Sequence, residues 1–496
     1  MNTNFKFSTN IIKNEWNKDL ESNEKKYTQL YKSIKTCITN VDLPDKWLLP
    51  STRYLSAELK LSRTTVVKAY ELLQLENLIE SKAGSGYKVS FSLLNTNEKY
   101  IAKREIDTNL YPKLSSRGES FLKNYGLINR SENEFVAFRP GLPPLDAFPV
   151  NQWKNLLNNY WRYIKSSNLS YAQATGLNAL KDSIKNYLYV SRNIRCKAEQ
   201  IIVLSGSLQS LYLISNVLIN EGDHVVLENP SFPNVHSVFK SLKADLIPID
   251  LDKEGLDIDE LSSKKSIDPK VIHLTPSNHY PLGIRMSIER RKAMLDWASY
   301  KKTIIIENDY ENEISNHKDK IPSIFSLDKE QRTVYMGTFN RLLHPSIRLG
   351  FMVVPEYLIQ AVNALQEHSH RFVAPSIQVV MNQFIERNYL YKHLNNIVEI
   401  AKKRHEIFTT EFSHCKSMTM LNTDFCSLHV YAVFNDQSDD NIEKRALDKA
   451  NKLGITALPL SKCYISIEKD KGLIFGYSAV RESILNKKLN LLKTIL

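Results

Sequence analysis

The sequence has few cysteines and no long apolar run. Its five cysteines, spread over 496 residues, are never spaced as C-x-x-C, which argues against a disulfide framework and against a zinc site. No stretch approaches the roughly 18 apolar residues of a membrane span, and the N-terminal segment lacks the apolar core of a signal peptide. We therefore expect a cytoplasmic protein with no membrane contact and no metal site.

A basic charge is present, but no single segment concentrates it. Lys and Arg number 66 against 54 Asp and Glu, which gives a net charge of +12. Residues 1–90 hold 14 basic and 10 acidic residues, so only +4 of that excess lies there. Charge alone is therefore weak evidence for a nucleic-acid partner, and motifs must carry that argument. The length exceeds what one hydrophobic core usually supports, so we expect two or three domains.

The first ninety residues carry the pattern of a small helical domain with a hairpin. One apolar stripe at helical spacing predicts a helix from about residue 26 to residue 39; its members are Tyr27, Leu30, Tyr31, Ile34 and Ile38. Ser51 can cap a second helix that runs to about Lys60, and Ser62 can cap a third.

The third helix has a polar N-terminal face. Its apolar positions, Val66, Ala69, Tyr70 and Leu73, are expected to face inward, which leaves Arg63, Thr64, Thr65 and Lys68 facing outward. Two helices joined by a short turn, with basic and hydroxyl residues opening the second, form the helix-turn-helix that enters a DNA major groove. Short strands at 78–81 and 87–90, joined by a glycine-rich turn at 82–86, predict a wing.

Residues 24–90 resemble the winged-helix domain of the GntR family of bacterial regulators. The resemblance rests on LPSTRYLSAELKLSRTTVVKAYELL followed by LIESKAGSGYKV. It implies that the domain binds double-stranded operator DNA, with arginines on phosphates or guanine edges and threonine hydroxyls on phosphates and base edges. The implied contact residues are Arg53, Ser62, Arg63, Thr64, Thr65, Lys68, Gly84 and Ser85. The alternative is that Arg53 and Arg63 are only solvated surface charges.

A polar segment and a long α/β pattern follow the winged helix. Residues 91–134 have no sustained apolar period, and we expect a semi-flexible linker there. Beyond residue 200, apolar runs alternate with amphipathic stretches, which predicts an α/β sandwich with a largely parallel sheet. The runs are 201–204, 225–227, 271–274, 303–306, 333–336 and 350–354. Ser205, Gly206 and Ser207 follow the first run and open a helix, an arrangement that can bind phosphate.

A series of motifs in fixed order resembles the second domain of MocR regulators. They are FRPGLPPLDAFP, VLSGSLQSLYL, LENPSFPN, HLTPSNHYPLG, IIIENDYENE, GTFNRLLHPSIRLGFMVVP and a final GYS. MocR proteins are a GntR subfamily in which this domain has the fold-type I architecture of enzymes that use pyridoxal phosphate (PLP). The resemblance implies a large domain over 135–365, a smaller α+β subdomain over 366–496, and a homodimer that exchanges its DNA-binding domains.

Three positions depart from that family. Arg341 stands where PLP-binding members have the lysine that forms the imine, and a guanidinium cannot replace an amine nucleophile. Asn308 stands where the family has the aspartate that holds the pyridine nitrogen protonated. Asp309 would point to the opposite face of its strand, because side chains alternate. Ile474 stands where an arginine commonly clamps a substrate carboxylate. We therefore expect no catalytic residues and no covalent cofactor.

Other groups of the PLP pocket remain. The resemblance assigns Ser205, Ser207 and Arg348 to the phosphate, Phe232 to stacking on the pyridine, and Tyr310 to its 3-hydroxyl. These residues keep three alternatives open: a small-molecule effector, a noncovalent complex with PLP, and a working PLP enzyme fused to a DNA-binding domain. They also fit a purely structural role in the core and dimer interface. His368 and His370 are two residues apart, unlike helical metal ligands at i and i+4, and we expect them at a surface.

Overall fold

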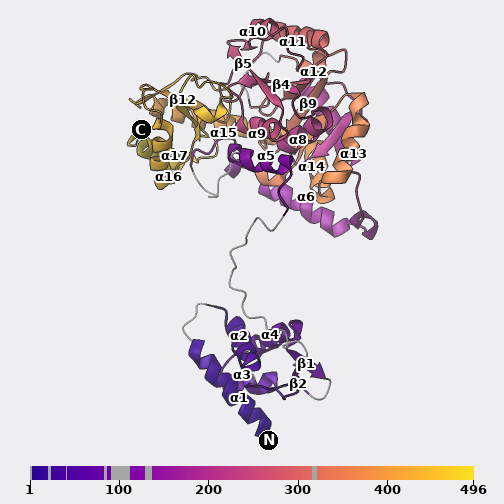
Figure 1. Ribbon diagram of the computed structural model, residues 1–496, viewed down its shortest axis with the longest axis vertical. Coiled ribbons are helices and arrows are strands. Elements are labelled where there is room, and N and C mark those ends of the chain that lie inside the picture. Colours follow the sequence, from indigo (N-terminus) through magenta and orange to yellow (C-terminus); the bar gives the residue numbers. More distant parts are fainter. Residues whose placement is uncertain are drawn as a thin grey trace. The chain divides into compact units, whose positions relative to one another are not determined.

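The computed structural model describes residues 3–19, 24–40, 42–82, 86–90, 112–128, 137–314 and 321–495. The chain divides into two units, Met1–Pro112 and Lys113–Leu496 (Figure 1). Among the described residues, no helix is both long enough and apolar enough to cross a membrane.

The first unit is a winged helix with one additional helix. Its elements are α1 (Thr3–Trp16), α2 (Lys26–Thr39), α3 (Thr52–Glu58), α4 (Arg63–Leu75), β1 (Ile79–Lys82) and β2 (Gly86–Val89). The two strands pair antiparallel, and the four apolar positions predicted to face inward on α4 are all buried. Helix α1 lies before the expected start at residue 24, yet its Ile12 and Trp16 are buried in the same core. The domain therefore begins earlier than expected.

An eight-stranded sheet forms the centre of the second unit. Its strands are β3 (Ile201–Leu204), β4 (His224–Asn229), β5 (Asp245–Asp252), β6 (Gly255–Leu256), β7 (Val271–Leu274), β8 (Ile304–Asn308), β9 (Thr333–Thr338) and β10 (Gly350–Val353). Their order is β3-β10-β9-β8-β7-β4-β5-β6. All neighbouring pairs from β9 to β5 are parallel, whereas β10 is antiparallel to both its neighbours. The six predicted runs all form strands, and the expected α/β fold is confirmed.

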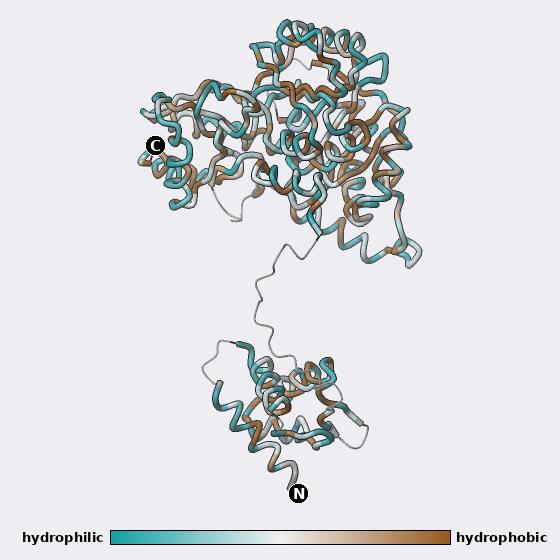
Figure 2. Tube along the Cα trace, in the orientation of Figure 1, coloured by the Kyte–Doolittle hydropathy of each residue, from teal (hydrophilic) through white to brown (hydrophobic). Residues whose placement is uncertain are grey.

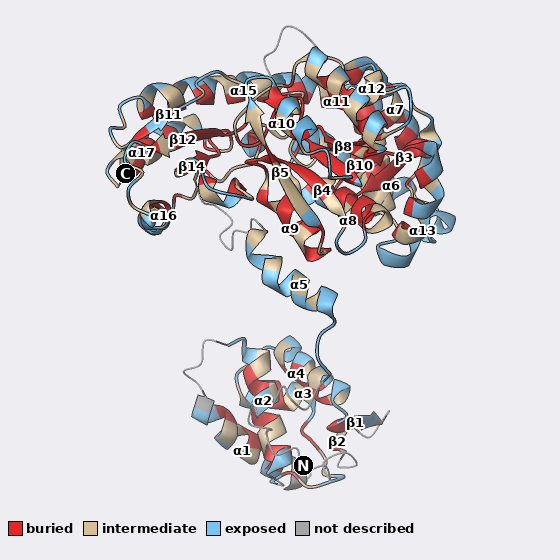
Figure 3. Cartoon of the chain, turned by 45° about the horizontal axis from the view of Figure 1, so that its top comes forward, coloured by how far each residue is buried: buried red, intermediate tan, exposed pale blue. Residues whose placement is uncertain are grey.

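Helices cover both faces of this sheet. They are α6 (Val150–Tyr163), α7 (Asn178–Arg192), α8 (Ser207–Leu218), α9 (Pro233–Ser241), α10 (Ile258–Ser263), α11 (Ile288–Lys301), α12 (Ile324–Leu327), α13 (Ile359–Ser369) and α14 (Pro375–Glu386). Alternate strand residues face different cores: on β3, Ile202 and Leu204 pack with α8, α9 and α13, while Ile201 and Val203 pack with α6, α7 and α14. The central strands are accordingly apolar (Figure 2) and buried (Figure 3).

The expected linker at 91–134 contains a helix. Helix α5 (Ser116–Asn124) packs on α9 through two hydrogen bonds: Ser120 Oγ donates to the Lys240 carbonyl at 3.0 Å, and Ser237 Oγ donates to the Asn124 carbonyl at 3.2 Å. None of its residues is fully buried, which explains why its sequence shows no clear apolar period (Figure 3). The second unit therefore starts at Lys113, and the linker expectation is wrong for α5.

A smaller subdomain completes the chain. It contains α15 (Tyr389–Phe412), α16 (Ile442–Lys452), α17 (Glu482–Lys493) and a sheet in the order β11-β12-β14-β13, whose strands are β11 (Met418–Met420), β12 (Val430–Phe434), β13 (Leu458–Pro459) and β14 (Gly472–Phe475). Leu394 of α15 packs in the core of the large domain, whereas Phe408 packs in that of the subdomain. A helix of 24 residues is roughly 36 Å long, which allows α15 to pack in both cores. The boundary therefore lies within α15, later than the expected position at 365.

Candidate functional site

The N-terminus of α4 is organised by Ser62. Its Oγ accepts a hydrogen bond from the Thr65 backbone N–H at 3.1 Å, as a helix cap does. The same oxygen lies 2.8 Å from Thr64 Oγ1 and 2.7 Å from Thr65 Oγ1. Ser62 therefore fixes the start of the helix and the position of both threonine hydroxyls.

The candidate DNA-contacting side chains lie at the surface of α3 and α4. Arg53, Arg63 and Lys68 are exposed. Among the described residues, neither arginine forms an ion pair, whereas the Lys68 ammonium lies 5.6 Å from the centre of the Tyr27 ring. Two unpaired guanidinium groups beside a helix N-terminus suit a phosphate backbone. Gly84 and Ser85, the expected wing contacts, lie outside the described residues.

A cavity of about 240 Å³ lies where strands of the large sheet end. It is bounded by the starts of α8 and α9, by the segments after β9 and η7 (Pro345–Ile347), and by residues 139–142. Of the predicted pocket residues, five line it: Ser207, Phe232, Asn308, Arg341 and Arg348. The other two lie directly behind the lining. Ser205 Oγ is 3.4 Å from Arg348 Nη2, and Tyr310 packs against Arg341.

Arg341 is held by a carboxylate and by two aromatic rings. Its Nη1 donates to Glu311 Oε1 at 2.8 Å. The guanidinium carbon lies 4.7 Å from the ring centre of Tyr310 and 5.6 Å from that of Phe232, both within cation–π range. Burial, the largest single effect, lowers the pKa of Arg341, but the combined effects of Glu311, Tyr310 and Tyr280 raise it more, so the pKa lies above its usual value. Position 341 therefore carries a cation that its neighbours hold in place.

Glu311 was not identified from the sequence. Its side chain is fully buried, and its second oxygen accepts from the Leu428 backbone N–H at 3.2 Å. The only available signal is its place directly after Tyr310 in the IIIENDYENE motif. A buried carboxylate needs a partner, but the sequence does not reveal which one the fold supplies.

Asn308 and Asp309 occupy opposite sides of their segment. Asn308 lines the cavity, with its Nδ2 3.4 Å from His273 Nε2 and its buried Oδ1 without a hydrogen-bond partner among the described residues. Asp309 faces away, pairs with Arg192 Nε at 2.7 Å and accepts from the Tyr335 hydroxyl at 2.7 Å. This agrees with the alternation argument that assigned the aspartate position to Asn308.

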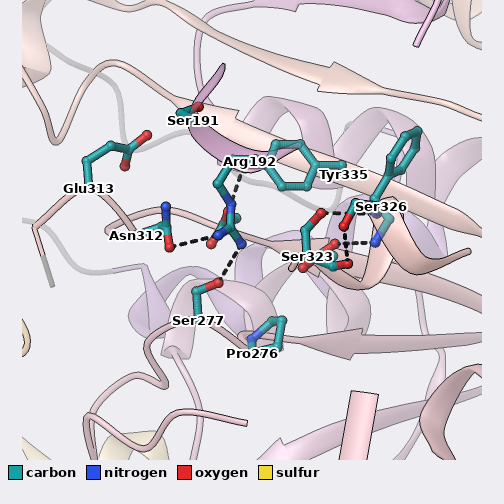
Figure 4. A network of polar contacts seen from close by, with 12 residues as sticks. Ser191, Arg192, Pro276, Ser277, Asn312, Glu313, Ser323, Ser326 and Tyr335 are labelled. Carbon is teal, nitrogen blue, oxygen red and sulfur yellow. Dashed lines mark hydrogen bonds and ion pairs between the residues drawn. The ribbon is translucent and has the colours of Figure 1, made fainter. Parts of the chain in front are cut away.

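Arg192 is buried, and its polar contacts lie away from the residues that line the cavity. Its Nη1 donates to Asn312 Oδ1 at 2.9 Å and its Nη2 donates to Ser277 Oγ at 2.9 Å (Figure 4). These contacts anchor the segment after β8. By pairing with Arg192, Asp309 therefore has a structural role.

Two further positions complete the cavity's charge pattern. Ile474 on β14 is fully buried in an apolar cluster with Tyr280 and Tyr310, so that strand supplies no cation. Arg139 is half-buried, lines the cavity, and forms no ion pair among the described residues. Arg139 was not predicted from the sequence, although it lies in the FRPGLPPLDAFP motif.

The loop after β3 requires a glycine. Gly206 has φ of +139°, and a Cβ there would lie 2.4 Å from Asn340 Nδ2. Asn340 Nδ2 donates to the Ser205 carbonyl at 3.0 Å, and its Oδ1 accepts from the Leu349 backbone N–H at 2.9 Å. Asn340 thereby ties the segment after β9 to the loop that opens α8.

The candidate histidines have no metal-binding geometry. His368 and His370 are exposed at the end of α13. In the part of the chain that the structure describes, no three His, Cys, Asp or Glu side chains are grouped so that they could hold a metal ion.

Known proteins share both units. Residues 141–449 match the aminotransferase class I and II family, and residues 26–89 match the bacterial regulatory proteins of the gntR family. A probable rhizopine catabolism regulatory protein, MocR of Rhizobium meliloti, is 28% identical over 477 residues, covering 96% of this chain and 94% of the relative. The chain belongs to the aminotransferase class I and II family. With a gntR-family domain preceding that region, it has the architecture of a MocR-type regulator.

Two other similar proteins match the whole chain and its second unit, respectively. The pyridoxine biosynthesis transcriptional regulator PdxR of Corynebacterium glutamicum is 24% identical, covering 92% of this chain and 93% of the relative. The crystal structure of Pyrococcus horikoshii kynurenine aminotransferase, a complex with PMP, has a TM-score of 0.67 and 24% identity, covering 79% of this chain and 96% of that one. The latter likeness establishes the fold of the second unit.

Proposed function

We propose that this MocR-type regulator binds operator DNA through α3 and α4 and uses its aminotransferase-like unit for dimerisation and effector sensing, without imine chemistry. The absence of imine chemistry rests on one observation. The guanidinium of Arg341 is paired with Glu311 at the position that the family resemblance assigns to the PLP lysine. A guanidinium that keeps its proton has no free amine to condense with an aldehyde.

The cavity fits only part of PLP. When bound, PLP supplies an aldehyde that captures amines and a ring that accepts electrons. Ser205, Ser207 and Arg348 suit its phosphate, as hydroxyl and guanidinium donors at a helix start do. The aldehyde end of PLP does not fit, because Arg341 stands where the family has the lysine amine. The guanidinium of Arg341 also lies against the Phe232 ring. We derive no catalytic step through PLP.

The test of lost imine chemistry uses the purified full chain with added PLP. Wild type should give no yellow imine band and, after borohydride reduction, no lysine modified by a pyridoxyl group in the mass spectrum. The matched control, Arg341→Lys, restores an amine at the same place and should acquire both signals. A stoichiometric borohydride-stable adduct on one lysine of the wild-type chain would refute the proposal and revive a PLP enzyme. Heat from PLP without an adduct would indicate the noncovalent complex.

The test of DNA binding uses the salt dependence of affinity. Each phosphate contact that is lost lowers the slope of log K against log salt by roughly one, because fewer counterions are released. Arg63→Ala should therefore weaken binding to the operator and flatten this slope, and Arg53→Ala should do the same. Lys18→Ala, an exposed lysine paired with Glu15 in the same unit, is the matched control and should change neither. An unchanged slope in Arg63→Ala would exclude its phosphate contact.

The dimer is tested separately. Sedimentation of the full chain at increasing concentration should give a species of twice the 57.2 kDa chain mass. A monomer at micromolar concentration would refute the dimerisation role and leave the DNA-binding proposal intact.

A further inference from the structure

The lining of the cavity contains three arginines and, among the described residues, no acidic side chain. The arginines are Arg139, Arg341 and Arg348. Glu311 behind the lining neutralises Arg341, but the structure describes no carboxylate within ion-pair distance of the other two. Two positive charges in a half-enclosed space are therefore left for a ligand to neutralise.

The two unneutralised arginines come from separate segments. Arg348 approaches Ser205 Oγ, next to the N-terminus of α8, where backbone N–H groups favour an anion. Arg139 lies on the segment 139–142, which reaches the cavity beside Arg341: a Cβ on Gly141 would be 3.0 Å from Arg341 Nη1. The Gly476 backbone N–H donates to the Phe138 carbonyl at 2.7 Å and fixes this segment to the end of β14. The anion-binding groups are thus presented by two fixed segments.

The remaining residues of the lining indicate which kind of ligand would fit between the arginines. Apolar side chains, including Phe232, Leu142 and Leu208, form walls between the polar groups. The buried Asn308 Oδ1, which has no partner among the described residues, lines the same space and can accept a hydrogen bond from a ligand. A volume of about 240 Å³ lies below the roughly 300–1,000 Å³ of drug-sized sites, so the ligand must be small.

We propose that the cavity binds a small ligand with two acidic groups on a flat apolar body, and that Arg348 binds one acidic group while Arg139 binds the other. Arg139 then supplies the carboxylate recognition that Ile474 cannot. This inference rests on the proposed effector-sensing role of the cavity, and it adds the chemical class of the effector and the residue that selects it.

The test compares two probes that differ by one acidic group, 4-carboxyphenyl phosphate and phenyl phosphate. Their affinities for the full chain are measured by titration calorimetry. Wild type should bind 4-carboxyphenyl phosphate about tenfold more tightly, as expected for one additional charge-assisted hydrogen bond. Arg139→Gln should abolish this preference and leave the affinity for phenyl phosphate unchanged. Arg348→Gln should weaken the binding of both probes. Arg162 is an exposed arginine on α6, and Arg162→Gln should change the affinity for neither probe.

Three results would overturn the inference: equal affinity of the two probes in wild type, a preference that survives Arg139→Gln, or no measurable binding of either probe. Thermal melting of each variant shows whether it is folded, so loss of binding through misfolding is recognised. A pyridoxyl adduct in the borohydride experiment would instead refute the proposed function. The two failures therefore give different signals.

Discussion

Removing the negative charge of Glu311 should destabilise the second unit strongly. The substitution Glu311→Gln keeps the shape of the side chain and one oxygen that accepts hydrogen bonds. It leaves the Arg341 guanidinium beside a neutral amide. Removing one partner of a buried ion pair costs about 3–5 kcal/mol, because the other charge is left unpaired. The Glu311 side chain is fully buried and that of Arg341 is 17% exposed, so we expect the lower end of this range, about 3 kcal/mol.

This cost converts into a melting shift through the size of the unit. Residues 113–496 form the second unit, and at about 2.1 cal/mol/K per residue their unfolding entropy is roughly 0.8 kcal/mol/K. A loss of about 3 kcal/mol then lowers Tm by about 4 °C. Scanning calorimetry of the full chain measures this shift in Tm. The transition of the second unit is recognised by its larger enthalpy, because that unit is the larger of the two.

A double-mutant cycle separates the ion pair from other effects. Arg341→Met removes the cation and leaves the Glu311 carboxylate unpaired, so it should also be destabilising. The double variant should cost about 2 kcal/mol less than the sum of the single variants, as residues in direct contact do. Additive single effects, or a loss below about 1 kcal/mol in Glu311→Gln, would refute the claim that Glu311 holds the guanidinium.

Three further predictions concern the loop, the network and the histidines. Gly206→Ala should cost more stability than Gly222→Ala by about 1–3 kcal/mol, because its Cβ would meet the Asn340 amide whereas the Gly222 position is open; equal melting temperatures would contradict this. Asp309→Asn should cost about 3–5 kcal/mol in urea denaturation, since it leaves a buried arginine unpaired, and a change below 1 kcal/mol would exclude a structural role. Burial lowers the pKa of His236 from its usual 6.5 to about 3, so its contribution to stability is present above pH 6.5 and is lost as pH falls toward 3. Stability measured from pH 6.5 to 5.5 should therefore fall by about 1 kcal/mol less in His236→Gln than in wild type, and identical slopes would show that folding does not lower the pKa of this histidine.

Local patterns in the sequence were enough to place many elements. The apolar spacing identified the buried face of α4, and Ser51 and Ser62 cap their helices as expected. Alternation along β8 correctly separated Asn308 from Asp309. These results depend on neighbours in sequence, which is why a single chain reveals them.

Features that depend on tertiary contacts were not predictable in the same way. Strand β5 (Asp245–Asp252) contains alternating acids and a proline and lies next to the sheet edge, so its sequence lacks a continuous apolar run. Arg139 lines the cavity, and Glu311 pairs with a lining residue, only because distant segments fold together. Helix α5 has no buried residue to mark it. Such residues carry no periodic signal, and only the assembled fold assigns them a place.

Helix α9 has two attachments with different roles. At its N-terminal end, Phe232, Asn234 and Val235 contribute to the cavity wall; Ser237 in its middle and Lys240 near its C-terminal end hold α5. A helix of nine residues is about 13 Å long. The wall of the cavity and the first helix of the second unit are therefore joined through one short helix. A substitution within α9 that disturbs either attachment can be expected to affect the other.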